Sequence, residues 1–278
     1  MATWRPDALQ RIDLAQLPEV EGVRYVISWQ QHGDAPIPPA FSARTDITIV
    51  RTDVVGLSAN RNNAIDHCTS DYILNADDDM AYDAVALTKL LDIFNRRKDL
   101  DFFMCQYANA DGRLAKDYPV FAEDITEKMP RGLWCGTVEL AFNRHGRLAK
   151  LRFEPLIGPG TETITSGEDE YLLLQAQRLR GVCRFVPLTL GRHLGTPHVE
   201  RRPLPDGQLR SFGFYITAAY PDMIRCRIVL KALRLSFCFK ASFFRGVRQM
   251  LAGRRFYIKN FRKKKKSAKF ALRNYWPL

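Results

Sequence analysis

Predicted strands and helices alternate along the first part of this chain, and that alternation most constrains its fold. Four apolar stretches rich in β-branched or aromatic residues are predicted strands: residues 23–29, 46–53, 71–79 and 101–108. Residues 56–68 begin with Gly and Ser, as helices do, and residues 84–97 repeat apolar residues at helical spacing. This order predicts an α/β fold, in which helices flank a mainly parallel sheet and ligands bind beyond the carboxyl ends of the strands.

The middle of the chain is less regular. Residues 132–144 include a predicted strand, and residues 155–170 are a predicted loop. A helix is predicted over 170–179, because its apolar residues share one face. Residues 183–193 are a predicted last strand that ends in a histidine.

The composition is that of a globular protein rather than a disordered or fibrous one, with 46% hydrophobic and 26% charged residues in a chain of 278. No apolar stretch reaches the roughly 18 residues of a membrane-spanning helix. The first residues, MATWRPDALQRIDL, contain no apolar core of a secretory signal. The six cysteines are widely spaced without a C-x-x-C pair, so we expect reduced thiols in a cytoplasmic protein.

The formal net charge of +12 is concentrated toward the end of the sequence. Residues 223–278 contain 17 of the 42 Lys and Arg residues and none of the 30 Asp and Glu residues, which leaves a mildly acidic body before them. The sequence therefore predicts two parts, a body over residues 1–205 and a basic helical appendage over 206–278.

Three adjacent carboxylates, Asp77, Asp78 and Asp79, follow directly after the apolar sequence DYILNA. Adjacent carboxylates repel one another, and a divalent cation would remove that repulsion. Mg²⁺ and Mn²⁺ prefer such oxygen ligands and complete their coordination with water and substrate phosphate. In an extended segment Asp77 and Asp79 would point the same way, toward one ion. The alternative is a solvated acidic turn that caps the next helix.

A second acidic cluster, Glu168, Asp169 and Glu170, opens the predicted helix after Ser166 and Gly167. By itself such a cluster is typical of ordinary helix capping. Its place favours a catalytic role, since it follows the first cluster by roughly ninety residues and precedes a strand that ends in a histidine.

Four segments in this order resemble the family 2 glycosyltransferases, which have the GT-A fold. GLSANRNNAI resembles the family's glycine-start helix with an Arg-Asn pair, and DYILNADDDM its strand with a D-x-D motif. Residues 158–181 are similar to its E-D segment with an amphipathic helix, and FVPLTLGRH to the strand and histidine that often follow. The resemblance spans residues 23–193 and implies a GT-A-like, Rossmann-like α/β domain over residues 1–205.

The resemblance implies a metal-dependent, inverting transfer of a sugar from a nucleotide diphosphate. Asp77 and Asp79 would hold Mn²⁺ or Mg²⁺ on the diphosphate, and Asp78 would contact the ribose or the sugar. Asp169 would be the general base for the acceptor hydroxyl, with Glu168 as the runner-up. UDP is the commonest donor nucleotide in the resembling family.

Further binding residues are implied by their positions in the family pattern. Arg61 would lie near the diphosphate, and Asp53 near the base or ribose. Ser28 and Gln30 stand in the first-strand turn and would also contact the nucleotide sugar. His193 would be a further ligand of the metal or diphosphate, although a lone histidine after a strand is more often a hydrogen-bonded loop residue.

The resemblance also implies an acceptor pocket, with Trp134, Gly158 and Gly160 in its wall. The alternative roles of these residues are core packing and turn geometry. The implied acceptor is a hydroxyl of a glycan or lipid-linked glycan in surface polysaccharide synthesis. Leu179 follows QAQR where processive members have a tryptophan, so we expect transfer of single sugars.

Residues 223–240 suit an amphipathic helix, in which Arg227, Lys231 and Arg234 form a cationic stripe beside an apolar one. Cations interleaved with aromatics, and the RKKKK run at 262–266, predict docking on the anionic inner face of the cell membrane. The alternatives are packing of this region on the body and non-specific binding of nucleic-acid phosphates.

A function of a different class stays open from the residues alone. The two acidic clusters and the basic region would also suit a nucleic-acid-binding protein or a two-metal nuclease. No helix-turn-helix, zinc-finger or RNP pattern is visible, so we expect no specific nucleic-acid partner.

Overall fold

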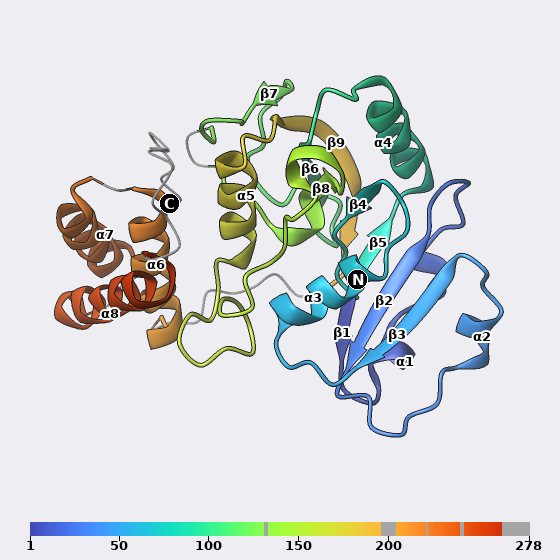
Figure 1. Ribbon diagram of the computed structural model, residues 1–278, viewed down its shortest axis with the longest axis horizontal. Helices are drawn as coiled ribbons and strands as arrows, with labels where there is room; N and C mark the ends of the chain where they lie inside the picture. Colours follow the sequence, from blue (N-terminus) through green and yellow to red (C-terminus); the bar gives the residue numbers. More distant parts are fainter. Residues whose placement is uncertain (131–132, 196–203, 221, 240–241, 263–278) are drawn as a thin grey trace.

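The computed structural model describes residues 1–130, 133–195, 204–220, 222–239 and 242–262. These residues form an α/β fold with two sheets (Figure 1). The first part of the chain forms a small sheet, the middle forms a larger one, and the last helices gather at the opposite end of the molecule from the small sheet. The predicted α/β class is confirmed.

The small sheet is parallel throughout. Its strands lie in the order β1 (Ala2–Trp4), β2 (Tyr25–Gln30) and β3 (Ile47–Thr52). β2 and β3 confirm the predicted strands at 23–29 and 46–53. β1 was not among the predicted strands, because three residues are too few to show a strand pattern. The connections contain short helical turns, namely α1 (Ala8–Arg11), η1 (Leu14–Gln16) and α2 (Pro39–Ser42).

The larger sheet is mixed rather than mainly parallel. Its strands lie in the order β4 (Tyr72–Leu74), β8 (Leu140–Asn143), β6 (Phe102–Ala108), β9 (Cys183–His193) and β5 (Met80–Tyr82). The short β7 (Glu123–Asp124) also pairs with β9. Among these pairs only β6 and β9 are parallel, because β8 and β5 both run against their neighbours.

The three aspartates lie in a turn and not in one extended strand. The predicted strand over 71–79 is shorter than expected, since β4 ends at Leu74 and the next strand, β5, begins only at Met80. The expectation that Asp77 and Asp79 point the same way rested on an extended backbone. The turn removes that basis, and the two side chains contact different partners.

The predicted strand over 132–144 is also shorter than expected. The described part of this segment forms the single helical turn η2 (Thr137–Glu139) followed by β8. A second such turn, η3 (Gly146–Leu148), follows β8. Glu139, at the end of η2, is fully buried, so this part of the chain is held by polar contacts as well as by strand pairing.

The three helices predicted in the body are confirmed within a few residues. They are α3 (Leu57–Asp66), α4 (Ala84–Arg96) and α5 (Glu168–Arg178). The Asp83 side chain caps α4 by accepting a hydrogen bond from the Ala86 amide, and α4 buries Leu87, Leu90 and Phe94. The N-cap of α5 is Gly167, in the left-handed region that favours glycine.

The last part of the chain forms α6 (Asp206–Ala219), α7 (Ile224–Phe239) and α8 (Phe243–Phe261) (Figure 1). α6 and α8 pack backbone to backbone, because a side chain on Gly213 would overlap the Met250 carbonyl and one on Gly253 the Arg210 carbonyl. Phe214 of α6 stacks edge-to-face on Tyr171 of α5, at a ring distance of 5.3 Å. These helices therefore pack on the body, while the predicted boundary at residue 205 stays a prediction.

The covered face of α7 contains the predicted apolar stripe and also one residue of the predicted cationic stripe. Its predicted apolar stripe is buried against α6 and α8, at Ile228, Ala232 and Leu235. Lys231 is buried as well, with Nζ 4.6 Å from the centre of the Phe212 ring, so the predicted cationic stripe is wrong at this residue. Residues 263–266 of the basic run lie outside the described residues.

No helix in the described part of the chain combines the length and the apolar character needed to cross a membrane.

Candidate active site

Arg61 joins three segments that are far apart in the sequence. α3 carries this side chain into the interior, where it is 6% exposed. Its Nη2 lies 2.9 Å from Asp77 Oδ1, and its Nη1 lies 3.2 Å from Glu168 Oε1 and 3.3 Å from Asp169 Oδ1. One buried guanidinium therefore holds the turn after β4 against the first turn of α5. Such an arrangement depends on every partner, because an unpaired buried charge costs several kcal/mol.

The charges in this cluster shift one another's protonation. Burial raises the pKa of Glu168 and of Asp169, and the neighbouring carboxylate adds to the shift at Glu168. Burial acts to lower the pKa of Arg61, but Asp77, Asp169 and Glu168 together raise it above its ordinary value. Arg61 therefore stays charged, and the carboxylates of Glu168 and Asp169 are stronger proton acceptors than exposed ones.

Asp169 has a second partner that the sequence did not indicate. Thr137 Oγ1 donates a hydrogen bond to Asp169 Oδ1, the oxygen that faces Arg61. Thr137 lies in the turn η2, whose end is fixed by the buried Glu139. That carboxylate lies 2.6 Å from Lys116 Nζ and accepts a hydrogen bond from the Gly136 amide at 2.8 Å. Residues 116–139 have no periodic pattern, so no sequence signal identified this support for Asp169.

Asp79 pairs with His193 rather than with the Arg61 cluster. Asp79 Oδ2 lies 3.1 Å from His193 Nε2, and the pairing of β5 with β9 sets Met80 opposite His193. The hydrogen bond to Asp79 raises the pKa of His193. Asp79 and His193 were both predicted metal ligands, and the structure brings these two together.

A hard divalent cation fits this pair. The pair offers a carboxylate oxygen and an imidazole nitrogen, which are donors that Mn²⁺ accepts, and both side chains are partly exposed. A side chain at Gly195 would come within 2.7 Å of Asp79 Oδ2, so glycine leaves the room beside it. The described residues contain no group of three or more His, Cys, Asp or Glu side chains placed for a metal ion. An ion here would take its other ligands from water and phosphate, and Asp77 as a ligand stays a prediction.

Asp78 connects the same turn to the small sheet. Thr3 Oγ1, in β1, donates a hydrogen bond of 2.5 Å to Asp78 Oδ2, and Arg11 lies 3.7 Å from the same oxygen. The three aspartates therefore face three directions, toward Arg61, β1 and His193. Thr3 was not a predicted site residue, since the first residues gave no strand signal.

The predicted nucleotide-binding residues of the small sheet are split between surface and interior. Asp53 follows the end of β3 and is exposed. Ser28 is buried in β2 and accepts a hydrogen bond of 2.7 Å from Asn63 Nδ2 of α3. Gln30 is 8% exposed, and its Oε1 has no hydrogen-bond donor among the described residues. Ser28 thus fixes α3 on the sheet, whereas the Gln30 side-chain oxygen is buried near the end of β2.

The predicted acceptor residues have different surroundings, with Trp134 beside Lys116 and the two glycines beside α3. Trp134 is 41% exposed, and its ring centre lies 3.6 Å from Lys116 Nζ. Gly158 and Gly160 have φ angles of +107° and +88°, and their loop packs on the start of α3. A side chain on Gly158 would come within 3.1 Å of the Glu168 carboxyl carbon. The two glycines therefore fit their alternative role in turn geometry and packing. Acceptor binding stays a prediction for Trp134, Gly158 and Gly160.

A family model and several solved structures are similar to this chain. Residues 37–146 match the family model described as glycosyl transferase family 2. No curated protein matches the chain significantly. The crystal structure of residues 1–349 of S. aureus TarS is similar with a TM-score of 0.58 and 10% identity, covering 96% of this chain and 91% of that one.

A longer S. aureus TarS structure has a TM-score of 0.56 and 12% identity, and it covers 98% of this chain, which spans 45% of its length. At these identities the likeness concerns the fold, which is that of GT-A glycosyltransferases. The matched family model covers Arg61 and all three aspartates of the turn. Part of this chain is therefore similar to glycosyl transferase family 2, and its fold is similar to that of the TarS structures.

Proposed function

We propose that this protein transfers a single sugar from a nucleotide diphosphate donor to a hydroxyl of a glycan or lipid-linked glycan, in surface polysaccharide synthesis. The observation that carries the proposal is the Arg61 ion-pair cluster. In this cluster Arg61 pairs with Asp77, which lies inside the region that matches the family model, and with Asp169, which lies outside it. Two acidic motifs with the family's order thus meet at one buried cation.

Asp169 is the general base of the proposed reaction. It accepts the proton of the acceptor hydroxyl while the hydroxyl oxygen bonds to the anomeric carbon of the donor. The bond from that carbon to the diphosphate oxygen breaks, and the nucleoside diphosphate leaves with the electron pair, so the configuration inverts. Asp169 suits this role better than Glu168, because its side chain is 19% exposed and that of Glu168 is 8% exposed.

The donor diphosphate binds at Asp79 and His193. Mn²⁺ or Mg²⁺ bound by this pair would supply positive charge for the diphosphate as it departs. Asp53 and Gln30 are the proposed contacts of the nucleoside, and Trp134 offers an exposed ring for an acceptor sugar. UDP is the donor nucleotide to test first, because it is the commonest in the family that the sequence resembles.

Calorimetric titration tests the donor half of this proposal. UDP, GDP and dTDP are titrated with and without Mn²⁺ into wild type, Asp79→Ala and the control Asp92→Ala, which changes an exposed carboxylate of α4. The proposal predicts metal-dependent binding of one nucleotide that Asp79→Ala abolishes and Asp92→Ala keeps. Absence of nucleotide binding to wild type would reject the donor assignment.

The nuclease alternative gains no support from the part of the chain that the structure describes. A two-metal nuclease needs several carboxylate or histidine ligands around each pair of ions. The described residues offer no group of three such side chains, and Asp77 and Asp169 are engaged by Arg61.

We further propose that α7 docks on an anionic membrane surface through the face that α6 and α8 leave uncovered. Leu230, Leu233 and Phe237 are 56%, 44% and 80% exposed, and their spacing sets them on one side of the helix. Phe244, in α8, is 83% exposed. The sequence has no acidic residue after Asp222, so nothing in this region repels an anionic surface.

Vesicle sedimentation tests this second proposal. Wild type should sediment with phosphatidylglycerol vesicles more than with phosphatidylcholine vesicles, and added salt should weaken the binding. Leu233→Asp/Phe237→Asp should release the protein. The control Val120→Asp/Phe121→Asp changes two exposed residues of the body, 79% and 78% exposed, and should sediment like wild type. Equal sedimentation of both variants would contradict the assignment of the face.

A further inference from the structure

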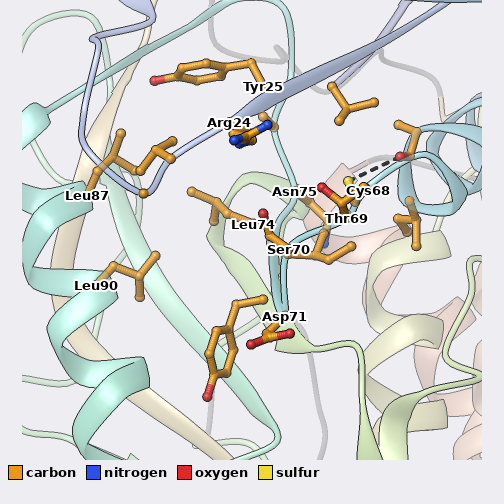
Figure 2. Close-up of a pocket in the computed structure, with 18 of the residues that line it drawn as sticks. Arg24, Tyr25, Cys68, Thr69, Ser70, Asp71, Leu74, Asn75, Leu87 and Leu90 are labelled. Carbon is orange, nitrogen blue, oxygen red and sulfur yellow. Dashed lines mark hydrogen bonds between the residues drawn. The ribbon is translucent and has the colours of Figure 1, made fainter. Parts of the chain in front are cut away.

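A cavity of about 720 Å³ separates the two sheets (Figure 2). Residues 22–26, which lead into and begin β2, form one wall, and residues 69–76, which include β4, form the opposite wall. α3 and α4 close the remaining sides. The apolar side chains that these helices contribute are Ala64, Ile65, Leu87, Leu90, Leu91 and Phe94. In Figure 2, Leu87 and Leu90 of α4 lie on one side, facing Tyr25, Leu74 and Asn75.

The wall formed by β4 is an open strand edge. β4 is the end strand of its sheet and pairs only with β8 among the described strands. The Asp71 carbonyl accepts from the Arg144 amide, and the Asn75 amide donates to the Leu140 carbonyl, so these residues face β8. Because backbone groups alternate along an antiparallel strand, the N–H and C=O groups of Tyr72 and Leu74 face the cavity.

The wall formed by β2 is open over part of its length. β1 covers only Ser28, Trp29 and Gln30 of β2. The Met1 amino group donates to the Val26 carbonyl at 2.9 Å and marks where the pairing ends. Since Val26 and Ser28 face the same side, the Val26 amide is directed into the cavity. Two unpaired strand edges therefore face each other across the cavity.

One polar atom of the proposed active site also borders this space. Arg61 lines the cavity, and its Nε–H is buried without an acceptor among the described residues. Buried donors without an acceptor are rare, because each costs as much as a lost hydrogen bond. A backbone segment in the cavity would bring carbonyl oxygens to this wall.

We propose that the cavity is a slot for one further β-strand, which lies in line with β1, attached at the amino group of Met1, and pairs with β2 and β4 at once. The strand joins the two sheets into one. Its side chains meet α3 on one face and α4 on the other, so they are apolar on both faces, as in central strands of α/β sheets. About five residues suffice, since a strand rises about 3.3 Å per residue.

The observations favour a strand over a small molecule. The cavity walls are two backbone edges and two apolar helix faces, which are the four neighbours of a central strand in an α/β sheet. The β1 register fixes where such a strand ends, because Met1 lies at the boundary of the cavity. The slot adjoins Arg61, so a strand there also supports the side chain that holds Asp77 and Asp169.

Extension of the full chain before Met1 tests the proposal. Val-Ile-Val-Ile-Val is placed directly before Met1 in one variant, and Gly-Ser-Gly-Ser-Gly in the matched control. The apolar extension should raise the melting temperature by roughly 4 °C or more over the control, as expected for a gain of order 1–2 kcal/mol in a chain of this size. Hydrogen exchange should slow at the Tyr72, Leu74 and Val26 amides, while the Arg144 amide, already bonded to Asp71, changes little.

A second extension keeps the test decisive if the first makes the protein insoluble. Thr-Val-Thr-Val-Thr retains strand propensity with less apolar surface, and it should give the same pattern of protection. A proline at its third position should remove the protection, because proline cannot donate to the ladder. Melting temperatures and exchange equal to those of the Gly-Ser control would overturn the proposal. Protection of Leu74 by a free Thr-Val-Thr-Val-Thr peptide, with none from the extension, would also overturn it.

Discussion

Arg61 Nη1 lies 3.3 Å from Asp169 Oδ1, although 108 residues separate them in the sequence. This contact joins the helix that follows the small sheet to the helix that carries the proposed base. Arg61 also binds Glu168 and Asp77, so three carboxylates depend on one cation. The integrity of the site should therefore be more sensitive to Arg61 than to any surface arginine.

Arg61→Ala should destabilise the fold by about 3–5 kcal/mol, because it leaves buried carboxylates without their counter-ion. Arg61→Lys should lose less stability but still impair activity, since an ammonium group cannot reach several carboxylates with the geometry of a guanidinium. Urea unfolding measures both changes. Arg152→Ala is the matched control, because Arg152 pairs with Asp66 at the surface with 36% exposure, and it should cost about 0–1 kcal/mol. Equal losses at the two arginines would contradict the cluster.

Gly158→Ala should be markedly destabilising. Its φ of +107° strains any residue with a side chain, and the added Cβ would lie 3.0 Å from Ser58 Oγ and 3.1 Å from the Glu168 carboxyl carbon. We expect a loss of about 2–4 kcal/mol in free energy of unfolding, from backbone strain and overpacking together. Gly112→Ala is the control, since Gly112 has φ of +83° with open space around it. It should lose only the strain, about 1–2 kcal/mol, and a loss as large as that at Gly158 would refute the packing argument.

The acid limb of the pH–activity profile should lie above the ordinary range of an aspartate. Burial raises the pKa of Asp169, and a base works only when ionised, so activity falls as the pH drops through this raised value. The hydrogen bond from Thr137 acts in the other direction and lowers this pKa. Thr137→Val should therefore move the acid limb of kcat/KM to higher pH, whereas Thr137→Ser keeps the donor and should restore the profile. An acid limb at the same pH in Thr137→Val and wild type would show that Thr137 does not affect the pKa of the base.

Lys116 and Glu139 should behave as a coupled buried pair. Lys116→Met leaves the fully buried Glu139 without its cation and should cost about 3–5 kcal/mol. The double variant Lys116→Met/Glu139→Gln removes both charges and should recover part of that loss. A double-mutant cycle measured by urea unfolding gives the coupling directly. Additive losses would show that the two groups do not stabilise each other.

The sequence predicted the elements that have a clear period. β2, β3, β6, α3, α4, α5 and β9 lie close to their predicted bounds, because each shows a strand or helix pattern long enough to recognise. β1 and the split between β4 and β5 were not predictable in this way, since each of these strands has only three residues. The mixed pairing of β8 and β5 depends on tertiary contacts that local patterns do not encode.

The residues of the candidate site were singled out from the sequence, but their pairings with one another were not. The two acidic motifs, Arg61 and His193 come from motif order, and the structure brings Arg61 to Asp169 and His193 to Asp79. The turn at Asp77–Asp79 directs the three carboxylates to separate partners, which an extended segment would not do. Thr137 could not be predicted from the sequence, because no motif surrounds it and its role depends on a tertiary contact with Asp169.

Release of nucleoside diphosphate from nucleotide sugars shows whether this site transfers a sugar with Asp169 as the base. Donors are incubated with a panel of hydroxyl acceptors and Mn²⁺, using wild type, Asp169→Asn and Glu168→Gln. We expect acceptor-dependent release by wild type and a loss of about 10²–10⁴-fold in Asp169→Asn, with nucleotide binding kept and a smaller loss in Glu168→Gln. Turnover at the wild-type rate in Asp169→Asn would show that Asp169 is not the base.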